Sequence, residues 1–392
     1  MSDESSEFPE DYRPGSEASK ENQTYESDTH LEPPSDAPLM AELISDTSSG
    51  GSSPKSDVEG FQSPYGGNAS FIQDSPRQAD RNTRLRWWSP LLMVLISLAS
   101  YLAVSGVMSA VALVVVTGDV SPELFEDPIA LQNAMSAVLS SRIGLFLSLV
   151  VPQIALVSPC LIAASISPVP FTERLGLVKG EWPVWSWLAV GAASPLVGII
   201  SGVVLSQFVE ESDTLKQMND VFRDHGASGF FLPLAFMIGV TPAFCEELLF
   251  RGYIQQRLAR VLPPGLGIFI ASFLFAAFHI DFVHVLAVFP LGLFLGWVTW
   301  RSGSLFPAMV GHFVNNFVSV IGIVFSPDMD QDSLELPAAT LTLSVFIFGF
   351  IGAILIGVVA RRQRLAGLHG NTVIGDVNSI TGNDASGEEL PS

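Results

Sequence analysis

Two adjacent carboxylates, Glu246 and Glu247, lie at the end of a long apolar run in the second half of the chain. The run is long enough to be embedded in a membrane, where charged side chains are costly and by default mark function. Residues four apart share a helix face, so Glu247 faces Arg251, with the acid N-terminal to the base, the favourable order for an ion pair. Glu246 points about 100° away and is left without a local partner. An unpaired carboxylate in a low-dielectric setting suits a general base that works near neutral pH.

Two further pairs of polar or aromatic residues occur in apolar segments downstream of the glutamates. Phe275 precedes His279 by four residues, and His312 precedes Asn316 by the same spacing. Each pair therefore shares a helix face, and the ring of Phe275 is expected to pack beside the imidazole of His279.

Each of these residues also has a structural interpretation when it is taken alone. A single histidine inside a membrane can serve packing or hydrogen bonding, and His312 with Asn316 could join two helices through a bond worth ~0.6 kcal/mol. His284 has no partner at a useful spacing, and Asp281 can simply end a helix at the surface, so a structural role is favoured for both.

Considered together, these residues are consistent with a single functional site. One unpaired carboxylate and two histidines lie on three segments that can meet inside a helical bundle, which is the set needed to activate water for hydrolysis. Glu246 would be the base, His279 and His312 would hold water or a metal, and Asn316 would donate to an oxyanion. Because such groups also build proton relays, a transporter or proton-coupled carrier is the alternative function, and a non-catalytic membrane scaffold is a third.

Three motifs in this order resemble a known family. They are Glu246-Glu247-x-x-x-Arg251, Phe275-x-x-x-His279 and His312-x-x-x-Asn316, on successive apolar segments. Together they are similar to the signature of the CAAX prenyl protease and bacteriocin-processing (CPBP, or Abi) family, and the resemblance covers about residues 170–320.

The resemblance implies an intramembrane endopeptidase with an eight-helix core. It implies catalytic roles for Glu246, His279, His312 and Asn316, with Glu247, Arg251 and Phe275 in support. No cofactor follows with certainty. Zinc held by Glu246, His279 and His312 is chemically acceptable, yet the same residues can activate water unaided and no His-Glu-x-x-His helix is present. Eukaryotic members remove the last three residues from prenylated CAAX tails, and some bacterial members confer bacteriocin immunity.

The composition requires apolar and charged residues to be segregated along the chain. The 392 residues are 48% hydrophobic and carry a net charge of −20, and most of the acids lie in the terminal segments and outer loops. Residues 1–84 are predicted to be a disordered acidic tail and residues 365–392 a disordered C-terminal tail, because neither can bury enough apolar surface to offset its ordering entropy. The two cysteines lie in apolar segments, and no basic stripe suggests nucleic-acid binding.

Residues 85–364 are predicted to form an all-α, polytopic membrane domain. About eight apolar segments are long enough to be spans, and they lie at about 87–117, 143–166, 183–208, 230–247, 265–280, 284–300, 305–325 and 338–360. Basic residues flank alternate ends of these segments, so the positive-inside rule places both termini in the cytoplasm. The prediction is a multi-pass integral membrane protein, in the inner membrane if the source is bacterial, with membrane lipid and a membrane-associated or lipidated peptide or protein substrate as partners.

One geometric condition follows from the functional interpretation. If the fourth span ended at the two glutamates, Glu246 would lie near its inner end while His279 would lie about 20 Å deep in the next span. The two residues come level only if the fourth helix continues to about residue 262 and an irregular turn at residues 279–284 dips inward, which is tolerated where backbone lines a wet cavity.

Overall fold

The computed structural model describes residues 88–325 and 336–381, and every regular element in this part of the chain is helical. Seven of its helices are long and apolar enough to cross a membrane, and an eighth, shorter apolar helix spans Pro264–Ala277. This confirms the predicted all-α polytopic fold with about eight spans, as expected for a chain that must satisfy its backbone hydrogen bonds inside lipid. The predicted N-terminal tail, residues 1–84, and residues 382–392 lie outside the described residues.

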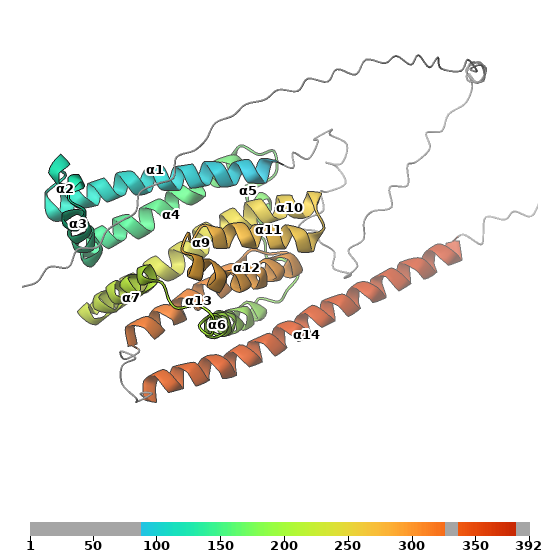
Figure 1. The fold of residues 1–392 in the computed structure, drawn as a ribbon. Helices are drawn as coiled ribbons and strands as arrows, with labels where there is room; N and C mark the ends of the chain where they lie inside the picture. The colour runs from blue at the N-terminus through green and yellow to red at the C-terminus, as the bar shows by residue number, and fades with distance from the viewer. Residues whose placement is uncertain (1–87, 326–335, 382–392) are drawn as a thin grey trace, which may run out of the picture. The chain divides into compact units, whose positions relative to one another are not determined.

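The first two spans form a pair. Helix α1 (Ser89–Thr117) packs along α4 (Arg142–Ser165), and the short helices α2 (Pro122–Glu126) and α3 (Pro128–Ser140) connect them (Figure 1). The side chain of Asp127 begins α3 by accepting bonds from two backbone N–H groups. Between the two long helices, the hydroxyl of Ser100 donates to the carbonyl of Ala155 over 3.0 Å.

A second group of helices surrounds α6 (Trp185–Leu205), which follows the short helix α5 (Phe171–Arg174). Helix α6 packs against α12 (Phe282–Ser302), α13 (Phe306–Phe325) and α14 (Leu336–Thr381). Helix α14 continues to Thr381, so residues 365–381 are helical and the predicted tail boundary after residue 364 is not the end of the helix. Residues 365–381 contain no proline, the residue that would break the helix most strongly.

The fourth span is a long and irregular helical path, Asp213–Val261. It begins with the amphipathic helix α7 (Asp213–His225) and bends in η1 (Gly226–Phe230), where Gly229 has φ 77°. The path continues through α8 (Phe231–Ala235), η2 (Phe236–Val240), α9 (Thr241–Glu247), η3 (Leu248–Gln255) and α10 (Gln256–Val261). The two segments η2 and η3 are π-helical, a conformation that occurs often at functional sites.

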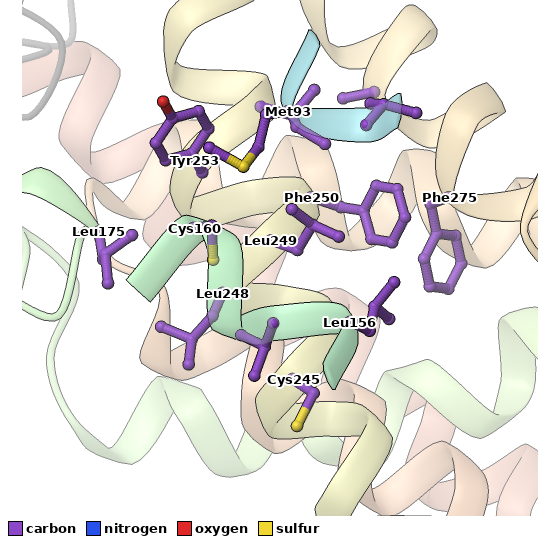
Figure 2. Close-up of a cluster of buried hydrophobic side chains, with 14 of the residues drawn as sticks. Met93, Leu156, Cys160, Leu175, Cys245, Leu248, Leu249, Phe250, Tyr253 and Phe275 are labelled. Atoms are coloured by element: carbon purple, nitrogen blue, oxygen red, sulfur yellow. The ribbon is translucent and has the colours of Figure 1, made fainter. Parts of the chain in front are cut away.

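The span therefore does not end at the two glutamates, as the segment boundary at residue 247 predicted. Leu248, Leu249, Phe250 and Ile254 are buried in the main apolar cluster, so the residues after Glu247 are core and the helix ends only before Pro263. Figure 2 shows this part of the chain beside side chains of α4. The structure thus meets the first part of the geometric condition.

Helices α10 and α11 (Pro264–Ala277) form an antiparallel hairpin about residues 262–263. Phe250 lies twelve residues before Leu262, and Phe275 lies twelve residues after Pro263. The rings of Phe250 and Phe275 meet edge to face with centroids 5.6 Å apart (Figure 2). Glu246 and His279 are likewise equidistant from the turn along the chain.

The turn between α11 and α12 has an unusual backbone. Ile280 has φ 62°, a left-handed conformation that is costly for a β-branched residue and often occurs at functional sites. Asp281 follows it and begins α12 by accepting a bond from the backbone N–H of His284 over 2.9 Å. Hydrogen bonds from the Ser212 hydroxyl and from that N–H hold the pKa of Asp281 below its ordinary value, because they favour the charged form. Asp281 therefore begins a helix, whereas the sequence suggested that it ends one.

Candidate active site

The ion pair predicted between Glu247 and Arg251 is present and fully buried. The Nη1 of Arg251 donates to Glu247 Oε1 over 2.8 Å, and neither side chain is exposed. The Nη2 of the same arginine donates to the carbonyl of Gly292 on α12 over 3.1 Å, and its guanidinium lies 4.1 Å from the ring centroid of Phe275. Arg251 thus joins the fourth span to α11 and α12.

Glu247 has a second partner that its spacing from Arg251 does not indicate. The Nδ1 of His312, on α13, lies 2.9 Å from Glu247 Oε1. Because a carboxylate oxygen is an acceptor, Nδ1 is the nitrogen that donates to Glu247, and in a neutral imidazole Nε2 then presents a lone pair. Glu247 therefore fixes the orientation and the tautomer of His312, in addition to balancing Arg251.

The other nitrogen of His312 faces the first glutamate. His312 Nε2 lies 3.9 Å from Glu246 Oε2, which is too far for a direct hydrogen bond. Glu246 is 8% exposed and His312 is 3% exposed, and Oε2 of Glu246 is buried without a hydrogen-bond partner. With a neutral imidazole, two buried acceptors face each other across this gap.

The local sequence suggested that Glu246 has no partner, but the structure gives it one. The Nε2 of Gln153, on α4, donates to Glu246 Oε1 over 2.8 Å. The prediction that Glu246 is unpaired was therefore wrong for one of its two oxygens, because spacing within a helix carries no information about a residue on another span.

His279 lies at the end of α11 and takes part in a cluster of rings. Its ring centroid is 5.3 Å from that of Phe275, as the spacing predicted, and 4.5 Å from that of His284. Its Nδ1 lies 3.3 Å from the carbonyl of Phe275. The ring of Phe275 also meets that of His312 edge to face, with centroids 5.8 Å apart. Phe275 therefore contacts both histidines, and His284, for which no partner was expected, packs on His279.

Asn316 lies one helical turn beyond His312 on α13 and contacts the fourth span. Its Nδ2 donates to the carbonyl of Ile238 over 3.1 Å, and its Oδ1 accepts from Asn315. Ile238 belongs to the π-helical segment η2, where the regular i to i−4 ladder is interrupted and carbonyls become available to side chains. One of the two N–H bonds of the Asn316 amide is therefore used to hold α13 against η2.

The residues fit the predicted zinc site poorly. Within residues 88–325 and 336–381, no group of three or more His, Cys, Asp or Glu side chains is placed to hold a metal. Glu246 and His312 face each other, but His279 contacts Phe275 and His284 instead of completing a set of three ligands with them.

Gln153 and the second role of Glu247 were missed by sequence reasoning. Gln153 follows Pro152 in the middle of an otherwise apolar helix, and a neutral polar residue at that depth is the one signal that could have drawn attention to it. The contact between His312 and Glu247 joins residues on different spans, and no local spacing encodes it.

Comparison with known proteins agrees with the motifs. Residues 228–318 match the model of a family described as type II CAAX prenyl endopeptidase Rce1-like. The matched segment contains all three motifs, from Glu246 to Asn316, and supports the resemblance of this chain to the CPBP family and to its CAAX-type intramembrane proteases. Searches of curated proteins and of solved structures found no match.

Proposed function

We propose that this protein is an intramembrane endopeptidase of the CAAX type, in which Glu246 activates water with the help of His312. The observation that carries the proposal is the gap of 3.9 Å between Glu246 Oε2 and His312 Nε2. A water oxygen about 2.8 Å from each atom would bridge them and donate one hydrogen bond to each. Its remaining lone pairs are then free to attack a carbonyl carbon.

The surrounding residues support this arrangement. Glu247 accepts from His312 Nδ1, so that Nε2 of the neutral ring is the acceptor, and the guanidinium of Arg251 holds Glu247 in place. A carboxylate that orients an imidazole, which in turn holds the reacting group, is a recurring arrangement in hydrolytic enzymes.

The reaction needs only groups on the chain and one water. Glu246 takes a proton from the water as the water oxygen bonds to the scissile carbonyl carbon, and the carbonyl π electrons move to its oxygen. When the tetrahedral intermediate collapses, the carbonyl re-forms, the C–N bond breaks and Glu246 returns its proton to the leaving amine. The products are a new carboxyl terminus and a released peptide.

Asn316 and His279 are assigned to the substrate side of the site. The Asn316 amide has a second N–H beyond the one that bonds Ile238, and it can donate to the oxyanion. His279 lies as many residues from the hairpin turn as Glu246 and packs on Phe275, so we assign its Nε2 to contact with the substrate or the leaving group.

The test is cleavage by the purified full-length protein in liposomes. The probes are a prenylated peptide that ends in a CAAX sequence and the same peptide with an unmodified cysteine. We expect Glu246→Gln to lower kcat by about 10²–10⁴-fold, because the general base is lost while shape is retained. Glu126→Gln, the same change at an exposed carboxylate of α2, serves as the control. Undiminished turnover in Glu246→Gln would refute the mechanism.

A further inference from the structure

We infer that Gln153 is a positioning residue for the catalytic carboxylate: it holds Glu246 Oε1 and thereby directs Glu246 Oε2 toward the water. The inference rests on the proposed function and assigns a positioning role to α4, a helix that contains none of the three motifs. It concerns a residue outside all three motifs and outside the matched segment, residues 228–318.

The two oxygens of Glu246 have different environments. Oε1 accepts a bond of 2.8 Å from Gln153, whereas Oε2 is buried, has no hydrogen-bond partner and faces His312 Nε2. A carboxylate held by one oxygen has lost most of its rotational freedom about its terminal bond. Gln153 therefore selects the orientation in which the free oxygen points to the water position.

The orientation of the Gln153 amide follows from charge. If its oxygen faced Glu246, two acceptors would meet at hydrogen-bond distance, which is unfavourable unless the carboxyl carries a proton. With the nitrogen facing Glu246, the amide donates to the ionised form and stabilises the state that accepts a proton from water.

Stability alone does not account for a glutamine at this position. The Oε1 of Gln153 is buried without a hydrogen-bond partner, and burying an unsatisfied polar atom is costly. An apolar side chain of the same length would fill the site without that cost. The contact that glutamine adds is the one with Glu246.

The position of Gln153 in α4 is itself well defined. Pro152 precedes it inside the helix, and Val150, Leu156 and Val157 of the same helix are buried. Helix α4 packs against both α1 and α9, so the Gln153 side chain projects from a fixed backbone.

The experiment measures the pH dependence of kcat and KM for Gln153→Met with the peptides described above. Methionine keeps the length of the side chain but removes the donor. We expect kcat to fall at least about tenfold, since a hydrogen bond to a charged group is lost, with KM changed less than about twofold. The shape of the pH profile should change as well, because the general base has lost its donor.

A second variant and a control separate positioning from packing. In Gln153→Glu, the new side chain donates to Glu246 only when it is protonated, so activity should be confined to lower pH than in the wild type. Ser100→Ala is the control, since it removes another hydrogen bond to α4, between Ser100 and Ala155, without touching Glu246. It should leave the shape of the pH profile unchanged.

The outcomes distinguish this inference from the function on which it rests. If Glu246→Gln is inactive but Gln153→Met has wild-type kcat and pH dependence, the positioning role is wrong and the proposed function stands. If Gln153→Met and Ser100→Ala lose activity equally with unaltered profiles, the role of Gln153 is packing and the inference is again wrong. If Glu246→Gln remains active, both the function and the inference are overturned.

Discussion

At the scale of single residues, the two neighbouring glutamates differ in their surroundings. Glu247 is fully buried between Arg251 and His312, whereas Glu246 meets Gln153 with one oxygen and leaves the other unpartnered. Adjacent positions on a helix point about 100° apart, so neighbours in sequence can face different partners. Replacing the two carboxylates should therefore have distinct consequences.

Glu247→Gln is expected to destabilise the fold as well as impair turnover. It leaves the guanidinium of Arg251 buried without the carboxylate that it bonds, a change that typically costs about 3–5 kcal/mol. Glu246→Gln should change the unfolding free energy much less, because no cation is paired with Glu246 at bonding distance. Reversible unfolding in mixed micelles, followed by circular dichroism, measures both. Equal losses of stability would contradict the distinction.

The double variant Glu247→Gln with Arg251→Met tests the origin of that loss. Removing both charges eliminates the uncompensated cation, so the double variant should be more stable than Glu247→Gln alone. It should remain impaired in catalysis, because the neutral amide at position 247 accepts the His312 bond more weakly than a carboxylate does. Recovery of activity together with stability would show that Glu247 has no role beyond its ion pair.

Removing metal from the purified protein tests whether its activity depends on zinc. Because Glu246 and His312 are not joined by a third ligand in the described part of the chain, we expect dialysis against a chelator to leave kcat within about twofold of its starting value. Elemental analysis of the purified protein before and after dialysis is the accompanying measurement. Loss of activity that zinc alone restores would show that the site gathers a further ligand.

At the scale of elements, close contact between α6 and α13 positions His312. Gly311 precedes His312, and a Cβ at position 311 would lie 2.5 Å from Ser194 Oγ and 2.9 Å from both a Leu295 methyl carbon and a Val190 methyl carbon. The absence of a side chain at this position therefore allows α13 to approach its neighbours closely, as small residues commonly do in membrane helices.

Gly311→Ala is expected to shift α13 and reduce activity strongly. Overpacking of this kind typically costs about 1–3 kcal/mol, and the displacement acts on His312 directly. Gly322→Ala on the same helix is the matched control, because a Cβ there meets nothing within 4 Å. The measurements are kcat and the unfolding midpoint of each variant. Similar results for the two variants would show that the contact between α6 and α13 beside His312 tolerates a larger side chain.

At the scale of the whole molecule, α11 determines how the chain crosses the membrane. Its residues, Pro264–Ala277, extend only about 21 Å, less than the ~30 Å of a hydrocarbon core. It nevertheless runs antiparallel to α10 and α12, so it reverses the direction of the chain as a full span would. Together with the seven long helices it returns the C-terminal end of α14 to the side on which α1 begins. The cytoplasmic location of that side remains a prediction from the basic flanks.

Cysteine labelling tests this orientation. Asp119→Cys lies in a predicted outer connection and Lys179→Cys in a predicted cytoplasmic one, and both positions are exposed. A membrane-impermeant maleimide should label Asp119→Cys in intact cells and Lys179→Cys only after permeabilisation. The native Cys160 and Cys245 are buried, so the unsubstituted protein provides a low background. The reverse labelling pattern would invert the predicted topology.

The sequence alone determined the class of fold and the residues of the motifs. Long apolar segments must become helices in lipid, because no water is present to satisfy their backbone groups, and the spacing of Glu247 and Arg251 defined an ion pair within one helix. Only the tertiary structure decided which of these residues meet. The contacts of Gln153 with Glu246 and of His312 with Glu247 join separate spans, and their geometry depends on how α4, α9 and α13 pack. Local spacing encodes contacts within one helix, whereas contacts between helices arise from packing of the entire bundle.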